Sequence, residues 1–339
     1  MSSSSSDVPA PEASEGVVPM RPAVVFPGQG SQAPCMGAAW YGHPSWSIVT
    51  EAEDVLHRSL EPMLLSADAA PESTTDTQLS VVICSMLSWS ILAAVVGVER
   101  GSGGPLLAGH SLGVVSALHA AGVLTVADTV RVVALRADLT EAACDGTTGM
   151  TALLLGVEGA REACRSAPGC WVANDNAPSQ TVIAGAHPAL LAAAATAREL
   201  GAGDVIPLKV AAAFHTPLMR QVSARFSAGL QEVPFSPHEA LIVHNGEPYP
   251  PGAVAPDRWR EVVADDLTTP VRWRETQCTL DRLGAKALVE AGHGRTLTGL
   301  AKRTVGHLRL LNAATPEACE SIATRMQDDA VRFLTSGAP

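Results

Sequence analysis

Short apolar runs recur along the chain, separated by longer stretches whose apolar residues are spaced for helices. The short runs predict strands at residues 22–26, 105–108, 241–245 and 287–290. The longer stretches predict helices at residues 45–66 (ended or kinked by Pro62), 115–121, 126–144, 259–266, 270–283, 297–303 and 316–333. Loops are predicted at residues 69–77 and around the prolines at 248–251.

Residues 79–98 are nearly all apolar and long enough to span a bilayer as a helix. However, they contain several serines, lack basic flanks and lead into the strand at 105–108. We therefore predict a helix that is buried against a sheet, not a membrane span.

A separate alternation of elements occupies the middle of the chain. Strands are predicted at residues 151–157, 170–174, 181–186 and 204–210, with helices at 159–167 and 188–200. This β-α-β-β-α-β order is the split motif of ferredoxin-like domains, and a hinge-like turn at 146–149 precedes it. We therefore predict a small subdomain at 146–210, inserted into a larger subdomain formed by 21–145 and 211–335.

Composition excludes several classes of function. The net charge of −11 argues against a nucleic-acid partner, and no basic cluster suggests a membrane surface. The seven cysteines show no Cys-x-x-Cys spacing, which predicts reduced thiols in the cytoplasm, and the ten histidines lack metal-ligand spacing. Residues 1–20 are rich in Ser, Pro and Glu and lack the features of a signal peptide. This composition predicts a disordered tail.

One stretch has the pattern of a catalytic turn. The apolar run 105–108 leads into Gly109-His110-Ser111-Leu112-Gly113, and an Ala-rich helix follows. Gly-x-Ser-x-Gly between a strand and a helix is the nucleophile elbow, which exposes the serine hydroxyl and places the next N–H at a helix N-terminus. A Gly-rich loop that happens to contain a serine is the alternative, so Ser111 is a candidate nucleophile.

Three other positions are candidates for the same site. The Gly-rich loop around Gln29 follows a strand but lacks the phosphate-binding patterns, so it is either a plain turn or an N–H donor loop beside the elbow. His215 is predicted at the end of an apolar strand, before a helix that begins near Pro217, where it is either structural or a general base. Arg136 lies among apolar helix residues, so it points either inward or to solvent.

Together these pieces resemble the malonyl-CoA:acyl carrier protein transacylases and the related acyltransferases of polyketide synthases. The matching stretches occur in the family's order between about residues 22 and 305. They are residues 26–32, 109–113, Arg136, 174–180 with 182–185, 213–219 and 269–271.

The resemblance implies an α/β fold, with a large α/β-hydrolase-like subdomain and a ferredoxin-like insert. It implies that Ser111 is acylated and that His215 is its base. The backbone N–H groups of Gln29 and Leu112 are then the oxyanion hole, and Arg136 pairs with the free carboxylate of the extender unit.

In the family a main-chain carbonyl orients the histidine, from a residue that we expect to be Gln or Asn. Asp266 stands at that position here, which also admits a direct role for its carboxylate. Val114 replaces a common Glu, and Thr140 replaces a Met that lines the acyl pocket in many relatives. Phe214 resembles the malonyl-type signature of polyketide acyltransferases. Malonyl is therefore the expected unit, with an alkylmalonyl or unusual acyl group as the alternative.

The resemblance implies a CoA thioester and a phosphopantetheinyl acyl carrier protein as substrates, with no bound cofactor and no metal. The carrier is expected on a separate chain, and the enzyme in the cytoplasm. A hydrolase that clears stalled acyl chains is a second hypothesis, against which Arg136 argues. A degenerate homologue that only binds the carrier is a third, against which the Ser111 and His215 pair argues.

Overall fold

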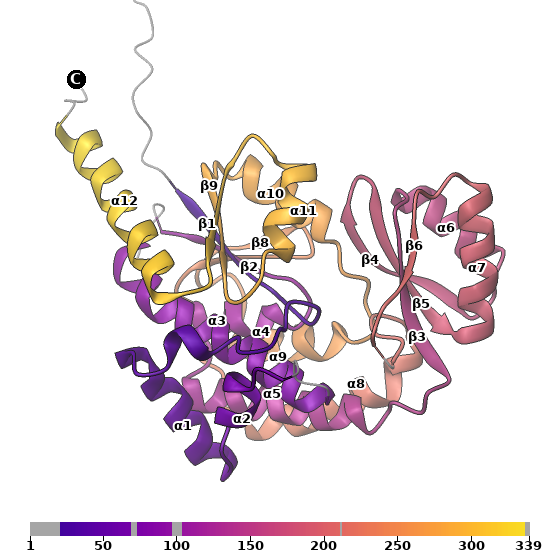
Figure 1. Cartoon of the computed structure of the whole chain (residues 1–339), viewed down its shortest axis with the longest axis horizontal. Coiled ribbons are helices and arrows are strands. Elements are labelled where there is room, and N and C mark those ends of the chain that lie inside the picture. Colours follow the sequence, from indigo (N-terminus) through magenta and orange to yellow (C-terminus); the bar gives the residue numbers. More distant parts are fainter. Residues whose placement is uncertain (1–20, 69–72, 97–103, 211, 336–339) are drawn as a thin grey trace, which may run out of the picture.

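The computed structural model describes residues 21–68, 73–96, 104–210 and 212–335. Its larger part is built on a six-stranded sheet with the strand order β10-β9-β1-β2-β7-β8 (Figure 1). All neighbouring strands are parallel except β7 and β8. The strands are β1 (Pro22–Phe26), β2 (Leu106–Gly109), β7 (Leu241–His244), β8 (Glu247–Tyr249), β9 (Ala287–Ala291) and β10 (Arg309–Ala313).

Helices cover both faces of this sheet, which is why β1 is apolar at every position and fully buried. Val24 and Phe26 pack into the core formed with the first group of helices, whereas Ala23 and Val25 face the second group. The first group comprises α1 (Ser47–Leu56), α2 (Glu61–Leu65), α3 (Thr74–Val96), α4 (Gly113–Ala120), α5 (Val126–Glu141), α8 (Arg220–Gly229) and α9 (Pro256–Asp265). The second comprises α10 (Trp273–Arg282) and α11 (Thr296–Thr304).

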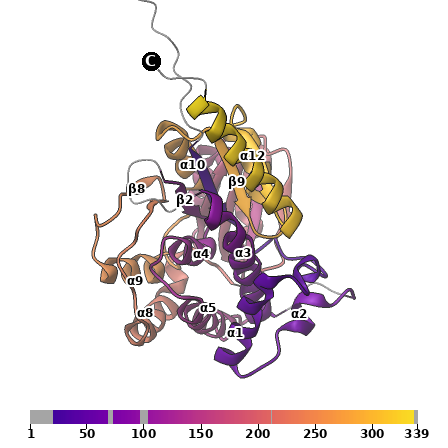
Figure 2. The same ribbon diagram turned by 90° about the vertical axis from the view of Figure 1, so that its left-hand side faces the viewer.

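The apolar stretch forms α3, which lies beside α4 and α5 and against the last helix, α12 (Pro316–Thr335) (Figure 2). Its segment Thr74–Ala94 is long and apolar enough to cross a membrane, but 78% of its most apolar window is buried inside the molecule. A helix apolar all round is expected to be buried in a core. The prediction of a buried core helix is therefore confirmed up to residue 96, and residues 97–98 of the predicted stretch lie outside the described residues.

The smaller part is an antiparallel four-stranded sheet with the order β4-β5-β3-β6. Two helices, α6 and α7, pack against each other and against this sheet (Figure 1). The elements are β3 (Thr148–Leu153), α6 (Val157–Arg165), β4 (Cys170–Ala177), β5 (Gln180–Ala186), α7 (His187–Glu199) and β6 (Val205–Pro207). This is the predicted split β-α-β-β-α-β arrangement, so the α/β fold with an antiparallel insert is confirmed.

Backbone and side-chain contacts join β4 to the larger part. The N–H of Asp175 donates to the carbonyl of Val271 over 2.9 Å, and the N–H of Val271 donates to Ala173 over 2.8 Å. Arg274 on α10 donates to both carboxylate oxygens of Asp175, at 2.8–3.0 Å. Residues of β4 are therefore fixed relative to the large sheet.

Several predicted elements differ from the structure. The helix at 45–66 is interrupted because His57 is left-handed (φ +52°), and Pro62 lies in the first turn of α2 instead of ending a helix. α3 begins at Thr74, within the predicted loop at 69–77, of which residues 69–72 lie outside the described residues. β8 occupies part of the predicted loop at 248–251. The pattern also missed β10, and the predicted tail at 1–20 lies outside the described residues.

Candidate active site

The turn between β2 and α4 requires its two glycines. A Cβ on Gly109 would collide with the backbone of Gly113, and a Cβ on Gly113 would collide with the carbonyl of Phe26 at the end of β1. Between them, Ser111 has a left-handed φ of +52°. The backbone therefore turns sharply, as the elbow pattern predicts, and presents Ser111 beyond the ends of two neighbouring strands.

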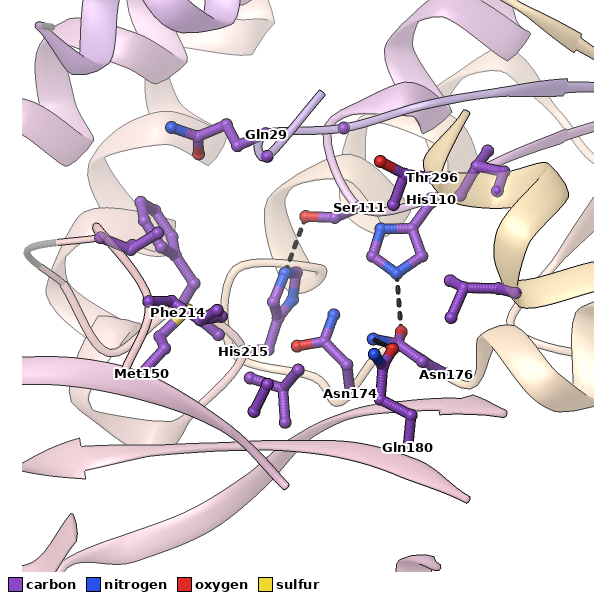
Figure 3. Close-up of a pocket in the computed structure, with 18 residues that line it drawn as sticks. Gln29, His110, Ser111, Met150, Asn174, Asn176, Gln180, Phe214, His215 and Thr296 are labelled. Atoms are coloured by element: carbon purple, nitrogen blue, oxygen red, sulfur yellow. Dashed lines mark hydrogen bonds between the residues drawn. The ribbon is translucent and has the colours of Figure 1, made fainter. Parts of the chain in front are cut away.

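His215 meets Ser111 at this turn. The Oγ of Ser111 lies 2.7 Å from the Nε2 of His215, and Figure 3 shows the two side chains pointing toward one another. The Nδ1 of His215 lies 2.7 Å from the carbonyl oxygen of Asp266, which can only accept a hydrogen bond. Nδ1 therefore carries the proton, and Nε2 is free to accept one from the serine hydroxyl.

The position of His215 differs in one respect from the prediction. Residues 212–214 form no strand, and His215 itself is left-handed with a φ of +62°. Its N–H donates to the carbonyl of Leu267 over 2.9 Å, which anchors this backbone beside the end of α9. The imidazole is thus held by a loop that is hydrogen-bonded to the end of α9, and not by the end of a strand.

Burial controls the protonation of this imidazole. The pKa of His215 is lowered to about 4, mainly by burial and also by the charges of Arg136 and His110, while Asp266 opposes the change. Since the pKa lies well below 7, the ring is neutral at physiological pH. A neutral imidazole is the form that acts as a base.

The loop that carries Gln29 lies directly beside the elbow. A Cβ on Gly28 would lie 2.6 Å from the carbonyl oxygen of His110, so the loop approaches as closely as it does because residue 28 has no side chain. Leu112 is the N-cap of α4. Within the described parts of the chain, the N–H of neither Gln29 nor Leu112 has a hydrogen-bond partner. These are the properties that an oxyanion hole needs.

Arg136 points inward and is only 4% exposed. It donates to the Oε1 of Gln78 on α3, and its guanidinium carbon lies 5.7 Å from the centre of the Phe214 ring. Burial lowers the pKa of Arg136 to about 10, while the charge of Asp266 opposes that change, so the guanidinium stays charged at pH 7. Both direct contacts of this buried cation are uncharged.

Thr140 and Val114 take different places. The Oγ1 of Thr140 accepts from the Nε2 of Gln78 over 2.9 Å, so Thr140 holds the side chain that holds Arg136. Val114 is 3% exposed within the core of the large part. The N–H of Val114 donates to the carbonyl of Ser111 over 2.9 Å, which is a bond of the turn itself. The predicted effect of Thr140 and Val114 on acyl selectivity stays a prediction.

A cavity of about 250 Å³ opens at Ser111 (Figure 3). Gln29, Phe214 and His215 line it, whereas among the described residues Arg136, Leu112, Val114 and Thr140 do not. The small sheet supplies part of its wall through the following residues: Met150, Ala152, Asn174, Asn176, Gln180 and Val182. The cavity therefore lies between the two parts of the molecule.

Sequence reasoning assigned no role to some residues of this site. The Nε2 of His110 lies 2.8 Å from the Oδ1 of Asn176, which ties the elbow to β4. The stretch 174–180 carried the resemblance, but nothing in its pattern pointed to this contact. Gln78 left a weak signal, as a polar residue at the edge of an apolar helix.

Comparisons with known proteins agree with this geometry. Residues 23–336 match the acyl transferase domain family. The malonyl CoA-acyl carrier protein transacylase of Synechocystis sp. is 35% identical over 86% of this chain and 97% of its own length. That of Escherichia coli K12 is 32% identical over 84% and 93%.

The chain belongs to the malonyl-CoA:acyl carrier protein transacylase family. Solved structures of this family are similar to this chain over about nine-tenths of its length. The acyl carrier protein S-malonyltransferase of Burkholderia pseudomallei 1710b has a TM-score of 0.82 and 30% identity, covering 90% of this chain and 100% of its own. A malonyl-transacylase solved with its type II polyketide synthase carrier protein has a TM-score of 0.82 and 32% identity, covering 90% and 99%. The chain is therefore an enzyme of the transacylase type, in a family that serves both fatty-acid and polyketide synthesis.

Proposed function

We propose that this transacylase moves a malonyl group from CoA to the phosphopantetheine thiol of an acyl carrier protein, through an ester on Ser111. The observation that carries the proposal is the 2.7 Å contact between the Oγ of Ser111 and the Nε2 of His215. A serine hydroxyl is a weak nucleophile until a base takes its proton, and this contact supplies the base.

The first half-reaction acylates the enzyme. The Nε2 of His215 takes the hydroxyl proton as the Oγ of Ser111 bonds to the thioester carbonyl carbon. The N–H groups of Gln29 and Leu112 stabilise the negative charge on the carbonyl oxygen. The carbon–sulfur bond then breaks, and His215 returns the proton to the departing CoA sulfur.

The second half-reaction reverses these roles. His215 takes the proton of the phosphopantetheine thiol, and the sulfur attacks the ester carbonyl. The bond between the acyl carbon and the Oγ of Ser111 breaks, and His215 returns the proton to that oxygen. The carbonyl of Asp266, which accepts from Nδ1 over 2.7 Å, keeps the ring oriented through both halves.

Arg136 supports malonyl as the acyl unit. Among the described residues, the recorded direct contacts of its buried charge are the uncharged Gln78 and Phe214, so a substrate carboxylate would give it a directly paired anion. Phe214 lines the cavity and its ring contacts Arg136, which supports a position for the carboxylate at the Phe214 end of the cavity. There the ring occupies space that a branched extender unit would need.

The substrates are accordingly a CoA thioester and a phosphopantetheinyl carrier protein, and the chemistry needs no bound cofactor. We place the enzyme in the cytoplasm with its carrier on a separate chain. The seven cysteines, all of which are free thiols, agree with a reducing compartment.

Intact-mass analysis tests the proposal. The protein is incubated with malonyl-, methylmalonyl-, acetyl- and butyryl-CoA, and the adduct mass is measured before and after addition of a phosphopantetheinylated carrier protein. We expect a malonyl adduct on Ser111 that moves to the carrier faster than it hydrolyses. An adduct that only hydrolyses would favour the hydrolase hypothesis, and no adduct in the wild-type protein would contradict both.

A further inference from the structure

Asp266 contributes two different groups to the site. Its carbonyl oxygen accepts from the Nδ1 of His215 over 2.7 Å. Its side chain makes a separate contact, in which the Oδ1 lies 3.0 Å from the Nε2 of His244 at the end of β7. Loss of the carboxylate would thus leave the orienting carbonyl in place.

The carboxylate is buried and incompletely paired. Asp266 is 8% exposed, and its Oδ2 has no hydrogen-bond partner within the part of the chain that the structure describes. A carboxylate can accept about four hydrogen bonds, and burying its charge is costly unless cations lie nearby. The site contains such cations, since Arg136 is charged and His215 becomes charged during the reaction.

The charged and titratable groups around His215 come from several elements. Arg136 on α5 and His110 in the elbow both lower the pKa of His215, whereas Asp266 after α9 raises it. Asp266 also raises the pKa of Arg136. The Nε2 of His244 on β7 joins the site through its 3.0 Å contact with the Asp266 carboxylate, and it also lies 3.4 Å from the Nδ2 of Asn245. Among the described residues, Asp266 is thus an anion whose charge acts on both Arg136 and His215.

We propose that the Asp266 carboxylate, held by His244, is a built-in counter-charge that stabilises the imidazolium of His215 while the Asp266 carbonyl orients the ring. Asp266 exchanges no proton and touches no reacting atom, so it is a positioning and electrostatic residue. The inference rests on the proposed function for its role in turnover, but the charge relation itself does not depend on any substrate.

The Asp266 carboxylate should stabilise the imidazolium of His215 but disfavour binding of a negatively charged acyl group. A negative carboxylate near Arg136 repels the free carboxylate of a malonyl group and competes for the same cation. It should therefore weaken malonyl binding while it speeds proton transfer. A neutral acyl group such as acetyl carries no charge to repel, which separates the two effects.

The first test measures the pKa of His215 by NMR in Ser111→Ala protein labelled at histidine. Adding Asp266→Asn, which keeps the carbonyl and the shape, should lower this pKa by about one unit, whereas Asp266→Glu should largely restore it. His244→Leu should also lower the pKa of His215, because the Asp266 carboxylate loses the hydrogen-bond donor that favours its charged form. Should Asp266→Asn fail to fold, His244→Leu and Asp266→Gln still decide the outcome. An unchanged pKa in the neutral variants overturns the proposal.

The second test compares steady-state constants for malonyl-CoA and acetyl-CoA. Asp266→Asn should lower kcat for both by about tenfold, the equivalent of one pKa unit, and should lower KM for malonyl-CoA alone. Equal changes in KM for the two thioesters, or an unchanged kcat, overturn the electrostatic role. If the wild type transfers no acyl group, the proposed function fails, while the NMR test still decides the counter-charge.

Discussion

Ser111 and His215 lie 104 positions apart in the chain, and both adopt a left-handed backbone, with φ of +52° and +62°. Such a conformation costs a non-glycine residue about 1–3 kcal/mol, and it persists only where the surroundings enforce it. Here the close approach of Gly113 to Phe26 enforces the first turn, and the hydrogen bond to Leu267 the second. The strain is thus part of what aims the two side chains at one another.

Ser111→Ala should abolish the acyl-enzyme, because no other group takes the place of its Oγ beside His215. Ser111→Gly should be equally inactive but more stable than Ser111→Ala by up to about 1 kcal/mol, since glycine adopts a positive φ without strain. Intact mass after incubation with malonyl-CoA measures the first effect, and denaturant unfolding the second. Uptake of malonyl by the alanine variant would show that Ser111 is not the nucleophile.

His215→Asn should lower the rates of both half-reactions by about 10²- to 10⁴-fold, the usual contribution of general acid–base catalysis. Asparagine tolerates the left-handed backbone, so the loop should keep its shape. Single-turnover rates of acylation and of transfer to the carrier measure the effect. His307→Asn is the matched control, because His307 is exposed and pairs with Asp281 at the surface. The His307→Asn variant should react at the wild-type rate.

The depressed pKa of His215 predicts how stability changes with pH. The histidine titrates at about 4 in the folded protein but near 6.5 in an unfolded chain. Between these values the unfolded state binds more protons, so stability is fully present above about pH 6.5 and falls as pH drops toward 4. The loss attributable to His215 is at most about 3 kcal/mol. Denaturant unfolding at several pH values should therefore show a flatter dependence in His215→Asn, and parallel curves would contradict the buried neutral histidine.

Local patterns made the elbow and the small subdomain predictable. Gly109 is required by its contact with the backbone of Gly113, whereas Gly113 is required by the carbonyl of Phe26 at the end of β1. Both glycines nevertheless stand within five residues of sequence around Ser111, so the pattern could be read locally. The strands and helices of the split motif are likewise bounded by short turns. Ser111 could thus be predicted as a candidate nucleophile before the fold was known.

Pairings between distant elements were not predictable from the residues alone. Gln78 contacts Arg136 only because α3 packs on α5, and His244 contacts Asp266 only because β7 ends beside α9. The short strands β8 and β10 lie at the two edges of the sheet, where a strand needs less of the apolar pattern. These contacts and edge strands therefore depend on tertiary packing, which local sequence patterns do not describe.

Phe214→Ser should widen the range of extender units. The ring is 4% exposed and lines the cavity, so its removal makes room for a 2-methyl or 2-ethyl branch. We expect the ratio of kcat/KM for branched over unbranched malonyl-CoA to rise by about 10- to 200-fold, the usual value of a small apolar contact. Phe235→Ser is the control, because Phe235 packs on Arg260 away from the cavity and should leave the ratio unchanged. A wild type that already prefers a branched unit would contradict the role of Phe214.

Arg136 decides between malonyl transfer and the alternatives. A carboxylate that accepts two charge-assisted hydrogen bonds from this guanidinium gains about 3–6 kcal/mol, which corresponds to about two to four orders of magnitude in selectivity over acetyl. Arg136→Ala should lose that much kcat/KM for malonyl-CoA and gain relative activity with acetyl- and butyryl-CoA.

Two further variants make the test of Arg136 specific. Arg136→Lys should rescue poorly, because an ammonium lacks the planar fork that pairs with a carboxylate and cannot reproduce the contacts with both Gln78 and Phe214. Arg131→Ala is the matched control: it lies on the same helix but is exposed and pairs with Asp128, so its removal should leave the selectivity unchanged. The measurement is kcat/KM for malonyl-, acetyl- and butyryl-CoA on wild type and each variant. If the wild type accepts butyryl as well as malonyl, the buried guanidinium is not a carboxylate clamp, and an unusual acyl unit or acyl hydrolysis becomes the better explanation of the site.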